Sequence, residues 1–370
     1  MRPEDELALL MRPAGGGVYL VSTGRREQVA LQQAVYGAAT ETAVDAAWRA
    51  DLERIKDARV ALLAVPSDVG AGFLRGANMG PAALRDAMLA AHPNLRERSR
   101  AARVVDVGDV FVVPQLLHDE MLSQAQLERS RVALYPGVAE GARALLPVAP
   151  LSMAERVIDL LFTLNAGLRL MVFGGDHSVA WPVASALARR DRRGLAIVQF
   201  DAHTDLLEER LGVPYCFATW SRHAARLLER PDRMVQVGIR ATRHERSHWE
   251  RETGVVQVWA DECRRDGALA AQRIVEALAA SGATRVYISN DIDGTDEAFA
   301  DATGTPEPDG LAPEFVVDVI RKIGERFEVV AGDVMEVAPP LERTPGGRAR
   351  TLATAMRYID ATLEGLLRAP

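Results

Sequence analysis

The sequence has very little cysteine and no long apolar run. Cys216 and Cys263 are the only cysteines in 370 residues, which excludes the disulfide framework of a small secreted protein and favours a reducing, cytoplasmic setting. No stretch approaches the about 18 consecutive apolar residues that a transmembrane helix needs. Charges in the opening MRPEDELALLM interrupt the apolar core that a signal peptide requires. We therefore expect a cytoplasmic protein without a membrane partner.

An excess of positive charge is also missing. The 44 basic and 51 acidic residues give a net charge of −7 at pH 7, whereas a nucleic-acid-binding domain is usually basic. We therefore expect no nucleic-acid partner. Hydrophobic residues make up 48% of the chain, which is typical of a globular protein, and the length suits one large domain or two ordinary ones.

Short apolar runs alternate with amphipathic stretches from Ala58 onward. This alternation predicts a mostly parallel α/β sheet with helices on both faces, in which functional residues follow the carboxyl ends of the strands. The expected strands are Val60–Val65, Val104–Val107, Leu168–Phe173, Leu195–Phe200, Met234–Val237, Val286–Ser289 and Phe327–Ala331, and the expected helices include Val179–Arg190, Leu269–Ala280 and Pro313–Glu325.

The first 57 residues differ from the rest of the chain. Between Thr40 and Lys56 the sequence is rich in alanine, and its larger apolar residues recur at helical spacing. We expect residues 1–57 to form an N-terminal helical extension and residues 58–370 to form the main domain.

Acidic residues and histidines follow three of the expected strands. They stand in the segments GGDHS, FDAHTD and SNDIDGTD. In an extended chain, residues i, i+2 and i+4 point to one side, so the members of each segment can converge. The sequence therefore predicts one cluster of carboxylates and imidazoles, made of His177, Asp201, His203, Asp205, Asp291 and Asp293.

Such a cluster requires cations, because carboxylates this close together cannot all stay ionised without them. Two divalent ions would relieve the repulsion and use every group. Oxygen and nitrogen ligands without a thiolate suit Mn²⁺, with Mg²⁺, Ni²⁺, Fe²⁺ or Zn²⁺ as alternatives. A single DxH or DxD motif is usually a capped turn, but three such motifs at three strand ends indicate a metal site.

The three motifs, in this order, resemble the ureohydrolase family, which is the arginase–agmatinase group of binuclear manganese hydrolases. The resemblance extends to Val65–Gly70, Thr303–Pro308 and Gly332–Glu336, and it covers the chain from about Ala58 onward. It implies a three-layer α/β/α catalytic domain over residues 58–370, built around a mostly parallel eight-stranded sheet. It also implies a homo-oligomer, either a trimer or a hexamer.

The resemblance implies a role for each matched residue. Asp201 and Asp291 would bridge two Mn²⁺ ions, with Ni²⁺ or another divalent ion as an alternative. The first ion would also bind His177 and Asp205, and the second would bind His203 and Asp293. Glu336 would bind the guanidinium group of the substrate.

The implied reaction is hydrolysis of a C–N bond in a guanidino or amidine compound, which releases urea and an amine. A hydroxide that bridges the two ions would attack the carbon. Bound metal lowers the pKa of water to about 7–9, so this hydroxide would exist near neutral pH. Asp205 would hydrogen-bond to it and pass its proton to the departing amine.

One departure from the family concerns proton transfer. The family often has a His-Gly pair, credited with proton transfer, in the loop after FDAHTD. Here Cys216 or Phe217 falls near the histidine position. His223 and His244 are candidates to replace it, with a structural role as the alternative for each.

A second departure concerns the substrate tail. After Val237–Arg240, arginases place an acid that helps to hold the α-amino group of arginine, whereas this chain has Arg243. An arginine there would favour a substrate carboxylate, unless Arg243 is only a surface residue. A guanidino acid is therefore the favoured substrate.

Other activities remain open. Arginase, agmatinase, formimidoylglutamase and guanidine hydrolase activities would use the same ligands. A non-catalytic subunit of the same family is a further alternative. So is a deacetylase on the same fold, although those enzymes resemble a one-zinc site with adjacent histidines, which this sequence lacks.

Overall fold

A nine-stranded sheet forms the middle layer of the structure, a computed structural model that describes residues 1–368. The strands are β1 Met11–Arg12, β2 Val60–Val65, β3 Val104–Val110, β4 Arg169–Gly174, β5 Leu195–Phe200, β6 Met234–Val237, β7 Val256–Val258, β8 Arg285–Asn290 and β9 Glu328–Val334. Their order across the sheet is β1-β3-β2-β4-β9-β8-β5-β6-β7. Strands β2 to β9 are parallel, and β1 pairs antiparallel with the end of β3.

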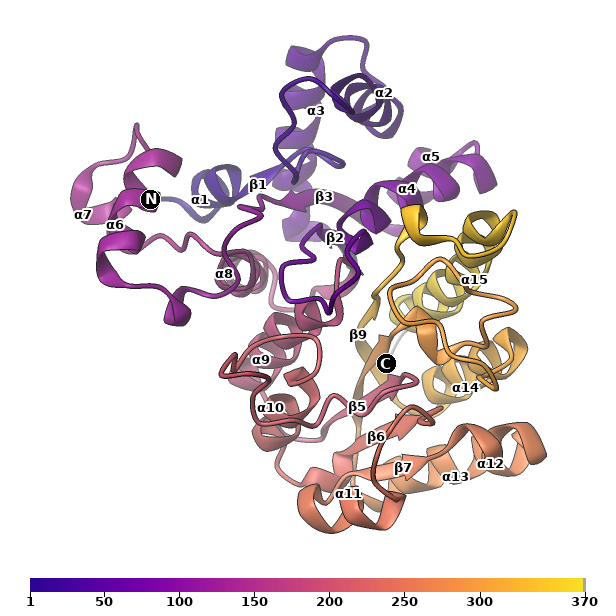
Figure 1. Ribbon diagram of the computed structural model, residues 1–370. Coiled ribbons are helices and arrows are strands. Elements are labelled where there is room, and N and C mark those ends of the chain that lie inside the picture. Colours follow the sequence, from indigo (N-terminus) through magenta and orange to yellow (C-terminus); the bar gives the residue numbers. More distant parts are fainter. Residues whose placement is uncertain (369–370) are drawn as a thin grey trace.

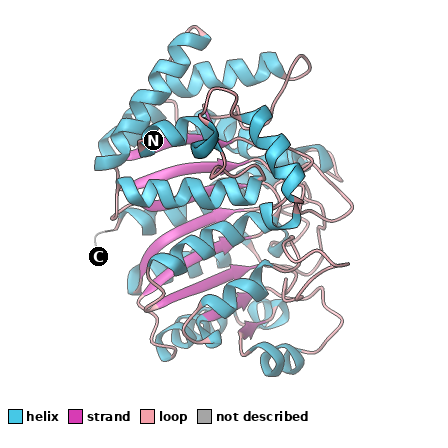
Figure 2. Cartoon of the chain, turned by 90° about the vertical axis from the view of Figure 1, so that its left-hand side faces the viewer, coloured by secondary structure: helices cyan, strands magenta, loops and turns pink. Residues whose placement is uncertain are grey.

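Helices cover both faces of this sheet (Figure 1). The helices are α1 Pro3–Leu10, α2 Arg25–Tyr36, α3 Glu41–Glu53, α4 Gly80–Ala91, α5 Leu95–Ala102, α6 Gln124–Leu134, α7 Glu140–Arg143, α8 Pro150–Leu164, α9 Ala180–Arg190, α10 Trp220–Leu227, α11 Arg246–Thr253, α12 Ala260–Arg265, α13 Gly267–Ala280, α14 Pro313–Arg326 and α15 Gly347–Leu367. Figure 2 shows the strands passing between helices on either side.

Two hydrophobic cores, one on each face, hold the three layers together. Successive side chains of a strand point to opposite faces, so Leu63 packs with α8 and α9, whereas Leu62 packs with α4 and α15. All six residues of β2 and of β5 are buried. Strands that are buried along their whole length and mostly apolar, with Gln199 of β5 as the polar exception here, are typical of parallel sheets with both faces covered.

The predicted three-layer α/β/α fold is confirmed, and all seven expected strands are present. Two strands were missed. Strand β7 has only three residues, which is too short to show a period-two pattern. Strand β1 has two residues and belongs to the N-terminal segment, where only helices were expected. The sheet therefore has eight parallel strands, as expected, and one added antiparallel strand.

The N-terminal segment packs directly against this sheet. The helix expected between Thr40 and Lys56 is α3, and the Thr40 hydroxyl caps it by accepting from the backbone nitrogen of Ala43. Trp48 on α3 is fully buried, and its indole N–H donates to the carbonyl of Val107 in β3 at 2.8 Å. Helices α2 and α3 lie at the top of Figure 1, beyond β1 and β3.

Four neighbouring strands direct their carboxyl ends to the predicted site. Strands β4, β9, β8 and β5 are adjacent in the sheet and parallel, so their carboxyl ends meet at one edge. His177 lies three residues beyond β4, Asp201 directly follows β5, Asp291 directly follows β8, and Glu336 follows β9. Within residues 1–368, no helix is long and apolar enough to cross a membrane.

Replacing Trp48 should show how strongly the N-terminal segment is held. Trp48→Ala removes a fully buried side chain and its hydrogen bond, so we expect the free energy of unfolding to fall by about 3–5 kcal/mol. Chemical denaturation of the full chain measures this. The control is Tyr19→Ala at an exposed position, where we expect a change within about 0.5 kcal/mol. An equal, small effect of both variants would contradict tight packing of α3.

Candidate metal centre

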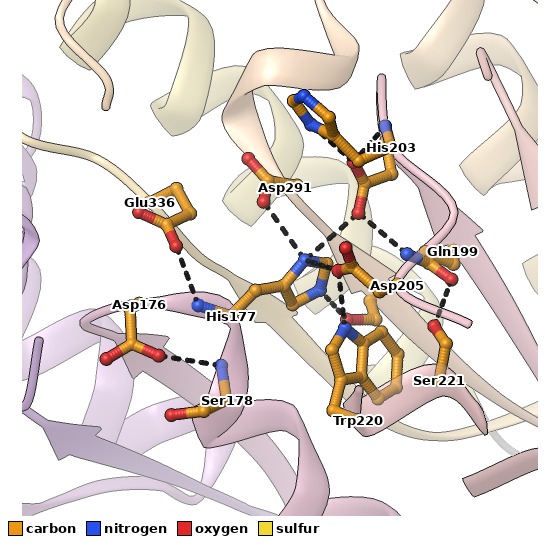
Figure 3. Close-up of polar contacts among 12 residues, drawn as sticks. Asp176, His177, Ser178, Gln199, His203, Asp205, Trp220, Ser221, Asp291 and Glu336 are labelled. Atoms are coloured by element: carbon orange, nitrogen blue, oxygen red, sulfur yellow. Dashed lines mark hydrogen bonds and ion pairs between the residues drawn. The ribbon is translucent and has the colours of Figure 1, made fainter. Parts of the chain in front are cut away.

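His177 stands at the centre of the predicted site. Its Nδ1 lies 3.1 Å from Asp201 Oδ2, 3.3 Å from Asp205 Oδ2 and 3.0 Å from Asp291 Oδ2 (Figure 3). The imidazole is buried, and within the described chain its Nδ1 has no partner with hydrogen-bond geometry. A buried nitrogen that faces three carboxylates and is not hydrogen-bonded is suited to bind a cation.

A polar chain behind His177 orients its ring. The Nε2 atom lies 3.0 Å from Ser289 Oγ, and Ser289 Oγ in turn donates to Asp333 Oδ1 at 3.2 Å. Asp333 Oδ1 also accepts from the backbone nitrogen of Asn290. Because the Ser289 proton points to Asp333, Ser289 accepts the proton of Nε2, so Nδ1, on the side of the carboxylates, is the nitrogen that can give up its proton to bind a cation. Such support is typical of metal-binding histidines.

A second group of ligand atoms forms around His203. Its Nδ1 lies 3.2 Å from Asp293 Oδ2 and 3.6 Å from Asp201 Oδ1. The two oxygens of Asp201 therefore face different histidines, with Oδ2 toward His177 and Oδ1 toward His203. Two clusters result, and within each the ligand atoms lie within 4.8 Å of one another. They share Asp201, and they consist of His177, Asp201 and Asp205 and of Asp201, His203 and Asp293.

Residues 201–205 do not bring their ligand side chains together as an extended chain would, with alternate residues pointing to one side. Strand β5 ends at Phe200, and Asp205 has a φ of +53°, so residues 201–205 do not form one extended segment. His203 and Asp205 consequently belong to different clusters. Asp205 is held in this uncommon conformation by the indole N–H of Trp220, which donates to its Oδ2 at 3.0 Å. Backbone strain of this kind is often found at functional sites.

Glycines allow the ligand segments to pack closely. A Cβ on Gly175 would lie 1.7 Å from the carbonyl oxygen of Ser67, and a Cβ on Gly294 would lie 2.7 Å from the backbone nitrogen of Asp201. These glycines are therefore required by the close approach of neighbouring backbones. Asp176 caps the turn that carries His177, because its carboxylate accepts from the backbone nitrogens of Ser178 and Gly70, each at 2.9 Å.

The electrostatics of the site reflect crowded carboxylates. Burial and the neighbouring Asp201 carboxylate raise the pKa of Asp205 to about 7. Burial, together with Asp293 and Asp201, also raises the pKa of Asp291. Burial lowers the pKa of His203, but nearby Asp293 and Asp201 outweigh it and raise that pKa to about 12. Without a bound cation, the site thus retains protons on carboxylates and imidazoles. This donor set of oxygens and nitrogens fits divalent metal ions.

Glu336 is the last of the predicted site residues. It follows β9, the strand that lies between β4 and β8 in the sheet. Its Oε1 accepts from the backbone nitrogen of His177 at 2.9 Å, and its φ is +59° (Figure 3). Burial raises the pKa of this carboxyl, and the Asp291 and Asp176 carboxylates raise it further. A cation placed beside Glu336 would therefore be stabilised.

Other residues that support the ligands were not predicted. Thr305 Oγ1 donates to Asp293 Oδ2 at 2.9 Å. The guanidinium of Arg240 donates to the carbonyls of Asp293 and Glu307, each at 2.8 Å. Arg240 therefore ties the last ligand segment to the loop that follows it. The position of Arg240 just beyond an expected strand was the only sequence signal, because these contacts depend on how distant loops meet.

Arg243 lies on the segment between β6 and α11, and it is exposed. The structure does not bring it into either ligand cluster, so its suggested role in substrate binding stays a prediction.

The two candidate proton-transfer histidines also lie outside the clusters. His223 Nε2 pairs with the carbonyl of Pro214 at 2.8 Å, and its ring contacts Trp181 and Tyr215. His244 is exposed and stacks on His248. Cys216, near the position of the missing histidine, is buried.

Comparisons with known proteins identify the family and several relatives of this chain. A model of the arginase family matches residues 58–361. N(1)-aminopropylagmatine ureohydrolase of Thermus thermophilus is 33% identical, over 77% of this chain and 84% of that protein. Guanidinobutyrase of Pseudomonas aeruginosa is 28% identical, over 83% of this chain and 87% of that protein. The structure of proclavaminate amidino hydrolase from Streptomyces clavuligerus has a TM-score of 0.62 and 29% identity, over 82% of this chain and 91% of that one.

Metal analysis tests the two clusters. Manganese-loaded wild type should retain about two ions per chain after dialysis, one for each cluster. Asp201→Ala should lose both ions because the clusters share Asp201, whereas His203→Ala should lose mainly one. The control Asp318→Ala removes an exposed carboxylate on α14 and should retain both. A single tightly bound zinc ion in untreated protein, together with deacetylase activity, would contradict the binuclear site.

Proposed function

This chain belongs to the arginase family, whose members hydrolyse C–N bonds of guanidino compounds, and from this premise we propose that it uses two Mn²⁺ ions to release urea from a guanidino acid. Ni²⁺ or another divalent ion is the alternative metal. The observation that carries the proposal is the pair of ligand clusters that share Asp201. Family membership also argues against the deacetylase alternative.

The proposed chemistry needs a nucleophile and a place for developing charge. Two divalent ions, when bound, would supply water of lowered pKa and positive charge near the reacting carbon. His177, Asp201 and Asp205 would hold one ion, and Asp201, His203 and Asp293 the other, with Asp291 beside His177 as a further bridging ligand. The Ser289–Asp333 pair would keep Nδ1 of His177 in its lone-pair form.

Asp205 would move the proton. Trp220 holds its Oδ2, and the positive φ keeps the carboxylate directed at His177. We propose that Asp205 accepts the proton of the attacking water and returns it to the departing amine. In this assignment His223 and His244 are not required, and Cys216 and Phe217 take no proton.

Glu336 would orient the substrate. Its Oε1 is held by the backbone of His177, which leaves Oε2 to face a guanidinium cation. A carboxylate and a guanidinium form strong charge-assisted hydrogen bonds. Because Glu336 is fixed to the residue that also binds the metal, the guanidinium carbon would be held close to the ions, and this orientation lowers the entropic cost of the reaction.

The substrate tail distinguishes two candidates. Arg243 favours a tail that ends in a carboxylate, and guanidinobutyrase is among the relatives. The 33% identity to N(1)-aminopropylagmatine ureohydrolase instead favours a tail that ends in an amine. We propose the guanidino acid and treat the amine as the alternative. Arginine and free guanidine belong in the same substrate screen.

The remaining proposals concern the whole chain. The family match begins at residue 58, which supports residues 1–57 as an extension added to a catalytic domain of residues 58–370. We also propose a cytoplasmic homo-oligomer, either a trimer or a hexamer. Size-exclusion chromatography with light scattering tests the oligomer. Urea release by the purified chain alone tests whether it is a catalytic or a supporting subunit.

Glu336→Gln tests the guanidinium site. The variant keeps the shape of the side chain but removes the charge, and loss of such a partner costs about 2–5 kcal/mol, so urea release should fall by at least about tenfold. Metal content should not change. The control Glu325→Gln alters an exposed carboxylate at the end of α14 and should leave turnover intact. Unchanged turnover in Glu336→Gln would show that the substrate is bound elsewhere.

Arg243→Asp tests the choice of tail. We expect the ratio of kcat/KM for guanidino acids to that for agmatine to fall by about two- to fivefold, because an exposed charge pair contributes about 0.2–1 kcal/mol. Urea release from 3-guanidinopropionate, 4-guanidinobutyrate, agmatine and arginine provides the measurement. Arg251→Asp, at an exposed position on α11, is the matched control. A wild type that prefers agmatine, or an unchanged ratio, would show that Arg243 is only a surface residue.

A further inference from the structure

Three glutamines lie side by side in the interior of the sheet. Gln199 in β5 is paired in register with Gln236 in β6, and Gln236 is paired with Gln257 in β7. All three side chains are completely buried. Burial of an amide is costly unless its hydrogen bonds are made, so the partners of these three side chains, which we call the glutamine ladder, indicate what the ladder does.

A continuous chain of hydrogen bonds runs through the glutamine ladder to the metal centre. The indole Nε1 of Trp259 donates to Gln257 Oε1 at 3.0 Å, and Gln257 Nε2 donates to Gln236 Oε1 at 2.8 Å. Gln236 Nε2 donates to Gln199 Oε1 at 2.7 Å, and Gln199 Nε2 donates to Asp201 Oδ2 at 2.6 Å. Figure 3 shows Gln199, at the metal-centre end of this chain, next to Ser221.

The two ends of the chain fix its direction. An indole N–H can only donate, and an ionised carboxylate can only accept. Every amide between them must therefore present its oxygen toward Trp259 and its nitrogen toward Asp201. Gln236 Nε2 also donates to the backbone carbonyl of Thr204, which requires the same orientation because a carbonyl can only accept. Aligned hydrogen bonds polarise one another, so the donor that reaches Asp201 is stronger than an isolated amide.

We propose that the glutamine ladder positions the Asp201 carboxylate for metal binding, with Gln199 as the positioning residue that contacts it. The inference rests on the proposed function, because it takes Asp201 as the ligand shared by two ions. Gln199 donates to Oδ2, and the backbone nitrogen of His203 donates to Oδ1 at 2.6 Å. One bond to each oxygen fixes the plane of the carboxylate, so that each oxygen faces a different ligand cluster.

The ladder acts unequally on the two clusters. Gln199 donates to Oδ2, the oxygen that lies 3.1 Å from His177 Nδ1. The cluster of His177, Asp201 and Asp205 should therefore depend on the ladder more than the cluster of Asp201, His203 and Asp293. A ladder that only filled the sheet interior would affect the stability of the protein but would not distinguish between two metal ions.

Calorimetric titration of metal-stripped full-length protein with Mn²⁺ tests the proposal. The variants are Gln199→Met, Gln257→Met and the double variant, because methionine is unbranched and fills irregular space. The matched control is Gln28→Met, which removes a buried amide bound to the carbonyl of Gly15 in the N-terminal segment. Thermal unfolding of the metal-stripped proteins records their stability separately. Trp259→Phe removes only the terminal N–H at the partly exposed end of the ladder, and it replaces Gln199→Met if that variant does not fold.

We expect Gln199→Met to weaken one of the two Mn²⁺ binding events by about 10- to 100-fold, the usual effect of removing a residue that supports a metal ligand. The other event should weaken less. Gln257→Met and Trp259→Phe should weaken the same event by smaller factors, and the double variant should be no weaker than Gln199→Met. Gln28→Met should bind Mn²⁺ as the wild type does.

Two different failures can be distinguished. Wild-type binding in Gln199→Met, equal weakening of both events, or strictly additive effects in the double variant would overturn the proposal and leave the proposed function intact. Failure of the wild type to bind any divalent ion would overturn both.

Discussion

Mutual repulsion among buried carboxylates is the constraint on which the site depends. Asp201, Asp205, Asp291 and Asp293 occupy one edge of the sheet, all are buried, and only two imidazoles lie among them. Hydrogen-bond donors around the site partly compensate for this crowding of negative charge. Trp220, Thr305, Gln199 and several backbone nitrogens donate to these carboxylates. These bonds keep the carboxylates together in an arrangement that only cations fully stabilise.

Sheet topology makes this crowding achievable. The ligands come from three segments spread over more than a hundred residues of the sequence, from His177 to Asp293, yet β4, β9, β8 and β5 are neighbours, and their parallel direction brings the carboxyl ends to one edge. The same order inserts β9 between the strands that carry His177 and Asp291. Glu336 therefore enters the site from between two ligand segments, which is the position from which one carboxylate can reach both the His177 backbone and a substrate.

The sequence predicted strands and ligand segments that have a local residue pattern. It could not predict contacts that arise only when distant strands are paired in a particular register. The mostly apolar strand β5 and the acidic segment that follows it could be predicted from Leu195–Asp205 alone, although the role of Gln199 within the strand could not. Strand β7 was missed because three residues carry no recognisable period. Ser289 and Asp333 could not be linked to His177, because they become neighbours only once β8 and β9 are paired. Spacing alone predicted the metal ligands as one group, and only the family resemblance assigned His203 and Asp205 to different ions. The structure places them in different clusters, and the positive φ of Asp205 that accompanies this division is not anticipated by any spacing rule.

The two outermost strands of the sheet have consequences beyond the metal centre. An edge strand exposes unpaired backbone groups, which can template the addition of another strand and lead to aggregation. Here the edges are formed by β1, with two residues, and β7, with three. Strand β1 pairs with only Val110 and Asp109 of β3, and α3 packs beside the rest of β3, where the Trp48 indole binds the Val107 carbonyl. The short outer strands and the helix beside β3 thus leave few backbone groups at the two edges for a strand of another molecule to pair with.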